Sequence, residues 1–97
     1  MKTWIISREE TSEALAGGMS YSHTTAVCIT PFTPGPAHIR AAIHQLFPGF
    51  EIDPGYTTVA EAVAEARETG SCTLKLRPAA GGHFLDSTFV RFEEAPW

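Results

Sequence analysis

Hydrophobic residues recur with a helical period in the middle of the chain. Over Ala37–Phe47, successive residues of a helix step ~100° around the axis, and the apolar ones then share one arc. Pro36 suits the first turn, where its missing N–H leaves no hydrogen bond unmade, and Pro48 with Gly49 stops the helix. The pattern predicts an amphipathic helix with these inward residues: Ile39, Ala42, Ile43, Leu46 and Phe47.

A second helix is predicted over Thr58–Thr69. Thr58 and Glu61 match a capping box, in which the side chain of each residue bonds a backbone N–H of the other. Gly70 follows where a left-handed cap residue is expected. Small side chains form the inward stripe and indicate close packing against a neighbour: Val59, Ala62, Val63 and Ala66.

Alternation of polar and apolar residues predicts β-strands around these helices. Ser71–Arg77 alternates cleanly, and His83–Phe92 is predicted as its hairpin partner across a loop at Pro78–Gly82. Three further strands are predicted from β-rich composition and from the turn residues that bound them: Lys2–Ser7, His23–Phe32 and Phe50–Asp53.

The register of the C-terminal hairpin is open on the sequence alone. A short loop would place Lys75 opposite Asp86 and Leu76 opposite Leu85. The last strand carries apolar residues on both faces, so the pattern does not single out one pairing. The residues of these two faces are Phe84, Val90 and Phe92 on one side and Leu85 and Phe89 on the other.

One more helix is predicted near the start of the chain. Ser7 and Glu10 match a capping box, and Gly17-Gly18 would end a helix over Arg8–Ala16. Together the elements predict a single α+β domain over residues 1–97. In it, a mostly antiparallel sheet with a C-terminal β-hairpin packs on two helices.

Charge and hydropathy restrict the classes of partner and the compartment. Seven basic residues against eleven acidic ones give a net charge of −4, which argues against sequence-independent binding of nucleic acid. No apolar run approaches the ~18 residues of a membrane span, and the N-terminal one is too short for a signal-peptide core. We therefore expect a cytoplasmic protein without membrane association, in which Cys28 and Cys72 are reduced, buried thiols and could be neighbours in the sheet.

The candidate chemistry for catalysis or metal binding is sparse. His38 and His44 lie ~240° apart on the predicted helix and cannot share a face, and His23 and His83 have no ligand at metal-binding spacing. There is no nucleophile elbow and no phosphate-binding glycine loop. The sequence predicts no catalytic residue, no metal site and no cofactor.

Two surfaces are candidates for binding a partner. Glu61, Glu65 and Glu68 fall within ~60° of arc on the second helix. They form either a solvated helix face or a docking surface for a basic partner, and the small cost of like charges does not decide between the two. The aromatic residues Phe89 and Trp97 are the second candidate, because aromatic side chains often anchor interfaces.

Two resemblances to known families bear on the fold. The predicted order helix, strand, helix, helix, hairpin over Arg8–Phe92 is similar to the winged-helix domain of DNA-binding proteins. The reading helix of that fold would fall on Thr58–Thr69, whose three glutamates would repel phosphates. The segment from Pro54-Gly55-Tyr56 to Arg67 resembles the turn and helix entry of HicB-like antitoxin domains, and it implies no site residue.

The sequence favours a non-catalytic module for protein–protein interaction, an inhibitor or regulator that docks on a protein or complex with a basic surface. In its short length, acidic charge and lack of catalytic motifs, the chain resembles phage-encoded antagonists of host defence such as anti-CRISPR proteins. Two alternatives stay open: a winged-helix transcriptional regulator, and a small enzyme or ligand-binding protein that uses histidines and carboxylates. A pocket with two histidines and a carboxylate would favour the enzyme. A homodimer is compatible with all three.

Overall fold

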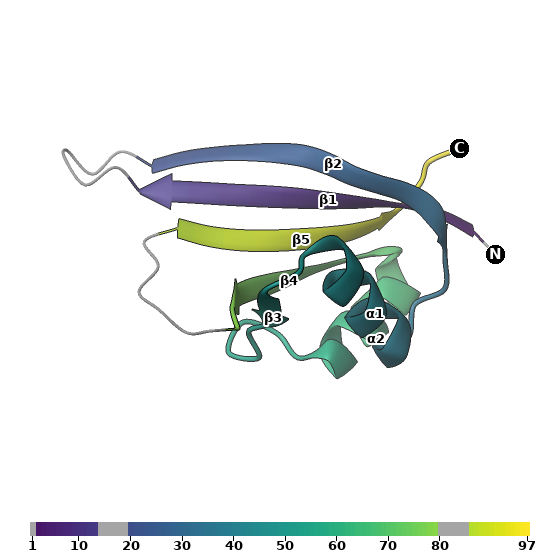
Figure 1. Cartoon of the computed structure of the whole chain (residues 1–97). Coiled ribbons are helices and arrows are strands. Elements are labelled where there is room, and N and C mark those ends of the chain that lie inside the picture. Colours follow the sequence, from purple (N-terminus) through teal and green to yellow (C-terminus); the bar gives the residue numbers. More distant parts are fainter. Residues whose placement is uncertain (1, 14–19, 80–85) are drawn as a thin grey trace.

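The described residues of the chain form five strands and two helices (Figure 1). The computed structural model describes the backbone of residues 2–13, 20–79 and 86–97, and the side chains of residues 2–9, 28–79 and 88–97. In chain order the elements are β1 (Lys2–Glu13), β2 (Ser20–Phe32), α1 (Pro36–Leu46), β3 (Phe50–Ile52), α2 (Val59–Thr69), β4 (Ser71–Pro78) and β5 (Asp86–Glu94).

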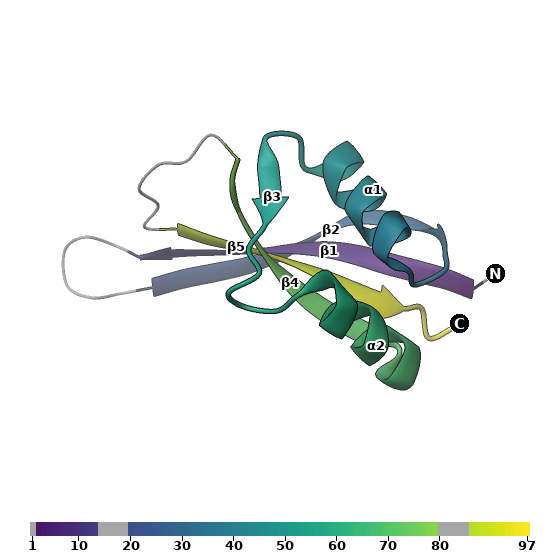
Figure 2. The same ribbon diagram turned by 90° about the horizontal axis from the view of Figure 1, so that it is seen from below.

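All five described strands join one antiparallel sheet in the order β2-β1-β5-β4-β3. Both helices pack on the same face of it, α1 on the side of β2 and α2 on the side of β4 (Figures 1 and 2). We call the other face the open face, because no helix of the described chain covers it. The predicted α+β domain is confirmed, with the final strand pairing to both β1 and β4.

The core lies between the sheet and the two helices. A row of side chains crosses the sheet from Ile6 to Phe92 to Cys72, and all three are buried. Aromatic rings fill the space beside this row, with the Phe32 ring centroid 5.7 Å from that of Trp4 and 5.3 Å from that of Phe92. Strands β4 and β5 add Leu74, Leu76, Thr88 and Val90 to the buried residues, and the helices with the residue after α1 add Ile39, Ile43, Phe47, Val59, Ala62, Val63 and Ala66.

The ends of the two helices follow the predicted signals. Pro36 opens α1, and the N–H of Phe47, just beyond its end, donates to the carbonyl of Ile43 at 2.9 Å. The capping box of α2 is formed by Thr58 and Glu61. Gly70 closes that helix with a φ of 81°, a left-handed conformation that glycine adopts without the steric cost of a Cβ atom.

The predicted helix over Arg8–Ala16 is wrong. Residues as far as Glu13 continue β1, and residues 14–16 lie outside the described part of the chain. Ser7 pairs with Ala26 of β2 and with Arg91 of β5, so its backbone belongs to the sheet ladder and the capping box is not formed. Strands β2 and β5 form ladder hydrogen bonds with this segment on both of its edges. These bonds stabilise the extended backbone more than a single helix cap could stabilise a helix with a poor apolar face. The element order behind the winged-helix resemblance therefore does not hold.

The structure settles the hairpin register, which the sequence left open, and it is not the pairing that a short loop would give. Lys75 pairs with Phe89 and Leu76 with Thr88, a shift of three residues from the expected partners Asp86 and Leu85. An odd shift exchanges the two faces of a strand. The observed register aligns Leu74 with Val90 on the buried face; residues 80–85, which include Phe84, Leu85 and most of the predicted loop, lie outside the described part of the chain.

Candidate functional site

The three glutamates of α2 are exposed and lie on the outer side of the helix. We call Glu61, Glu65 and Glu68 the α2 acidic face. Four inward residues fix the orientation of the helix, because each of them is at most 8% exposed: Val59, Ala62, Val63 and Ala66.

Glu61 differs from the other two members of the α2 acidic face. Its Oε1 accepts from the backbone N–H of Thr58 at 3.3 Å and from the Thr58 hydroxyl at 2.9 Å, and its own N–H donates to that hydroxyl at 3.2 Å. Within the described chain, Glu65 and Glu68 form no ion pair. The Glu61 carboxylate therefore caps the start of α2, whereas the carboxylates of Glu65 and Glu68 are available to a partner.

The basic residue of α2 does not neutralise these carboxylates. The Arg67 guanidinium donates from Nε and Nη2 to the carbonyl of Pro34, at 3.3 and 3.1 Å. This contact ties the last turn of α2 to the segment that precedes α1. The positive charge of the helix is therefore directed away from the α2 acidic face.

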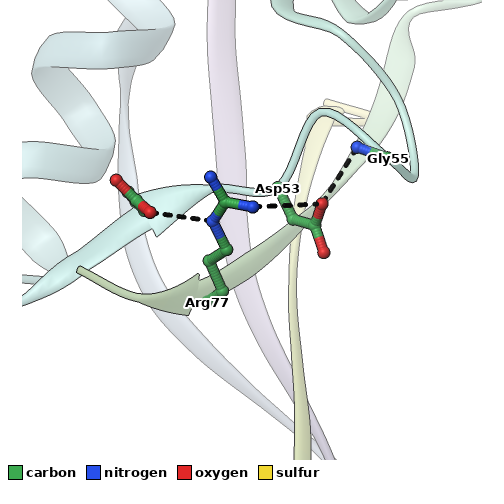
Figure 3. Close-up of polar contacts among 4 residues, drawn as sticks. Asp53, Gly55 and Arg77 are labelled. Carbon is green, nitrogen blue, oxygen red and sulfur yellow. Dashed lines mark hydrogen bonds and ion pairs between the residues drawn. The ribbon is translucent and has the colours of Figure 1, made fainter. Parts of the chain in front are cut away.

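Four carboxylates of the sheet and its turns are, by contrast, paired with basic residues. Arg77 Nε lies 2.8 Å from Glu51 Oε1, and Arg77 Nη1 lies 4.0 Å from Asp53 Oδ1 (Figure 3). The other pairs are Lys2 with Glu94 at 3.1 Å and Arg91 with Glu93 at 3.8 Å. The described side-chain carboxylates without an ion pair are then Glu9 of β1 and the three glutamates of α2, so most of the unpaired negative charge of the described side chains lies on α2.

An aromatic pair on the open face was not predicted. The Asp53 carboxylate accepts from the N–H of Gly55 at 2.9 Å and holds the turn after β3 (Figure 3). This turn sets the Tyr56 ring against that of Phe89, with centroids 5.3 Å apart in a T-shaped arrangement. The Asp53-Pro54-Gly55 sequence signalled a turn, but the contact of Tyr56 depends on a strand more than thirty residues away in the sequence.

The predicted binding residues do not form one surface. The α2 acidic face lies in the helix layer, whereas Phe89 is half-buried on the open face. Trp97 follows the end of β5 and is 75% exposed. The chain therefore offers separate candidate surfaces, which separate variants can test.

A hollow of about 420 Å³ lies between α1, β3 and the start of α2. Its polar lining includes His44 and Glu51, and the Glu51 carboxylate is already paired with Arg77. His38 is exposed and contacts Phe32, at 6.3 Å between ring centroids. With one histidine, this hollow lacks the two that would favour an enzyme, and the described residues hold no group of three metal-binding side chains.

Both described cysteines are free thiols on the helix face of the sheet. Cys28 pairs with Ile6, Ile6 with Phe92, and Phe92 with Cys72, so the cysteines end one row across four strands. Three strand spacings separate their Cα atoms by about 14 Å, twice the reach of a disulfide. Burial, with a smaller contribution from the Glu65 charge, raises the pKa of the Cys72 thiol to about 11.

Comparison of the chain with protein-family models, curated proteins and solved structures found no match. Neither α1 nor α2, the helices of the described chain, is long and apolar enough to cross a membrane.

Proposed function

We propose that the protein is a non-catalytic interaction module that docks on a macromolecular partner and acts there as an inhibitor or regulator. The observation that carries this proposal is the uncompensated charge of the α2 acidic face. Glu65 and Glu68 are exposed and form no ion pair within the described chain, while four carboxylates on the sheet and its turns are paired.

Such a surface suits a partner with a basic patch. Complementary charge speeds diffusional encounter and rejects wrong partners, and its effect falls with salt. Proteins that bind nucleic acid carry basic patches of this kind, so they form the first class of partner to test. The packing of Val59 and Val63 against the core holds α2 in place, so the carboxylates need no reorganisation of the helix before binding.

The experiment begins with capture of the partner from the source cells on the immobilised protein. The identified partner is then purified, and its association rate is measured by stopped flow at low and physiological salt. We compare Glu65→Gln/Glu68→Gln with the control Glu9→Lys, which also adds two units of charge. Glu9 is exposed and lies in β1, outside α2.

We expect the double variant to associate several-fold more slowly than the wild type at low salt, with a weaker dependence on salt. Glu9→Lys should lose less, because its added charge is remote from the docking surface. If the double variant associates at the wild-type rate at low salt, the α2 acidic face is only solvated. The open face around Tyr56 and Phe89 then becomes the better candidate.

A further inference from the structure

β2 forms one edge of the described sheet. It is thirteen residues long and pairs only with β1, whereas the opposite edge strand, β3, has three residues (Figure 1). Along the outer side of β2, backbone N–H and C=O groups have no strand partner within the described chain. An unpaired edge of this length is a template for one more strand.

Proteins usually prevent such an edge from pairing with another chain by means of charged side chains, proline or a bulge. The sequence of β2 contains no Lys, Arg, Asp or Glu, although every other strand contains at least one of them. Its ladder with β1 shifts register opposite Ile6 and Ser7, and Pro31 lacks an N–H near its end. The shift lies between Ala26 and Cys28, and the segment Ser20–Ala26 before it pairs with β1 in one unbroken register.

The surroundings of β2 also suit an added strand. On the open face, Ile29 is 59% exposed and pairs with the half-buried Ile5, so an apolar strip reaches the edge. On the helix face, a hollow of about 300 Å³ lies between β2 and α1, lined among others by Cys28, Ala42 and Leu46. Alternate side chains of an incoming strand point to opposite faces, so one set would cover the strip and the other would enter the hollow.

We propose that the occupant is a second copy of this chain, with the two β2 strands pairing antiparallel about a two-fold axis. Pairing of identical strands in this way is self-complementary. Since β2 carries no charge, the paired edges bring no like charges together, and a basic peptide would find no carboxylate on β2 itself. Helix α2 lies toward β4, across the helix layer from β2 (Figure 2), so the α2 helices of the two copies stay apart.

The test is the oligomeric state of the intact protein, measured by sedimentation velocity over a range of concentrations at physiological salt. We expect a dimer for the wild type and at least a tenfold weaker dimer for Ile29→Lys, which sets a charge at the paired edge. Tyr56→Lys is the matched control, because Tyr56 is also exposed, at 55%, and lies in the turn after β3. It should dimerise like the wild type.

Hydrogen exchange on the wild type provides a second measurement that does not depend on a variant. The outward amides of β2 should exchange more slowly at concentrations where the dimer forms than at concentrations where it dissociates. A wild type that stays monomeric overturns the proposal and leaves the edge to a strand of another protein. A dimer that survives Ile29→Lys, is weakened equally by Tyr56→Lys, or leaves β2 exchange unchanged also overturns it.

Discussion

Replacing Glu61 by lysine should destabilise the protein, whereas the same change at Glu65 or Glu68 should not. Loss of the capping box with Thr58 costs about 1 kcal/mol. Reversing the charge in the first turn removes a favourable interaction with the helix dipole and adds an unfavourable one, each of about 0.3–1 kcal/mol. Relief of the repulsion between Glu61 and Glu65 returns about 0.2–0.5 kcal/mol. The net loss for Glu61→Lys is about 1–3 kcal/mol.

Glu65→Lys turns a like-charge pair with Glu61 into an attractive one, and Glu68→Lys places a cation near the helix C-terminus, where the dipole favours it. Both variants should therefore lie within about 0.5 kcal/mol of the wild type. Urea unfolding followed by circular dichroism measures all three, and Glu61→Lys should also lower the melting temperature by roughly 5–15 °C. Equal stability of Glu61→Lys and the wild type, or equal losses at all three positions, would refute the structural role assigned to Glu61.

Two further predictions concern the core and the buried thiol. Leu74→Ala should lower the free energy of unfolding, measured in urea, by about 2–5 kcal/mol, because Leu74 is fully buried. Thr73→Ala, on the open face of the same strand, should lower it far less. Equal losses would contradict the assignment of the two faces. At pH 8, Cys72 should react with a thiol reagent much more slowly than the half-buried Cys28, because its pKa is raised to about 11. The pKa of Cys72 in the folded protein lies above the ordinary value of 9.0. The stabilisation that the protonated thiol gives the folded state is therefore complete below pH 9 and is lost as the pH rises toward 11. Over this range the free energy of unfolding of the wild type should fall by about 2–3 kcal/mol more than that of Cys72→Ala. Parallel pH profiles of the two proteins would contradict the burial argument.

The helices could be predicted because their signals are local. In α2, the cap at Thr58, its partner Glu61 and the closing Gly70 all lie within or beside the helix, and each was found in its expected role. The inward residues of both helices followed from the period of 3.6 residues alone. The same reasoning predicted that Glu65 and Glu68 face solvent.

The sheet could not be predicted to the same depth because its signals are not local. The segment from Arg8 to Glu13 has a weak apolar pattern, and strands at residues 20–32 and 86–94 hold it extended. The hairpin register depended on which of Phe89 and Val90 faced the helices, and only packing against the helix layer decides this. Strand order, and with it the identity of β2 as an edge, is a property of the assembled sheet.

The two proposals assign the α2 side of the domain to a basic partner and the β2 edge to a second copy of the chain. A net charge of −4 would oppose self-association if it were spread evenly, but most of the unpaired carboxylates among the described side chains lie on α2, and the sequence of β2 contains no Lys, Arg, Asp or Glu. A dimer joined through β2 would carry two α2 helices, each on the side of its helix layer away from β2 (Figure 2). Such an arrangement can bind two basic patches at once, and the second contact then forms at a high effective concentration. Because Ile29→Lys removes the joint and Glu65→Gln/Glu68→Gln removes the charge, the two contributions to partner binding can be measured separately.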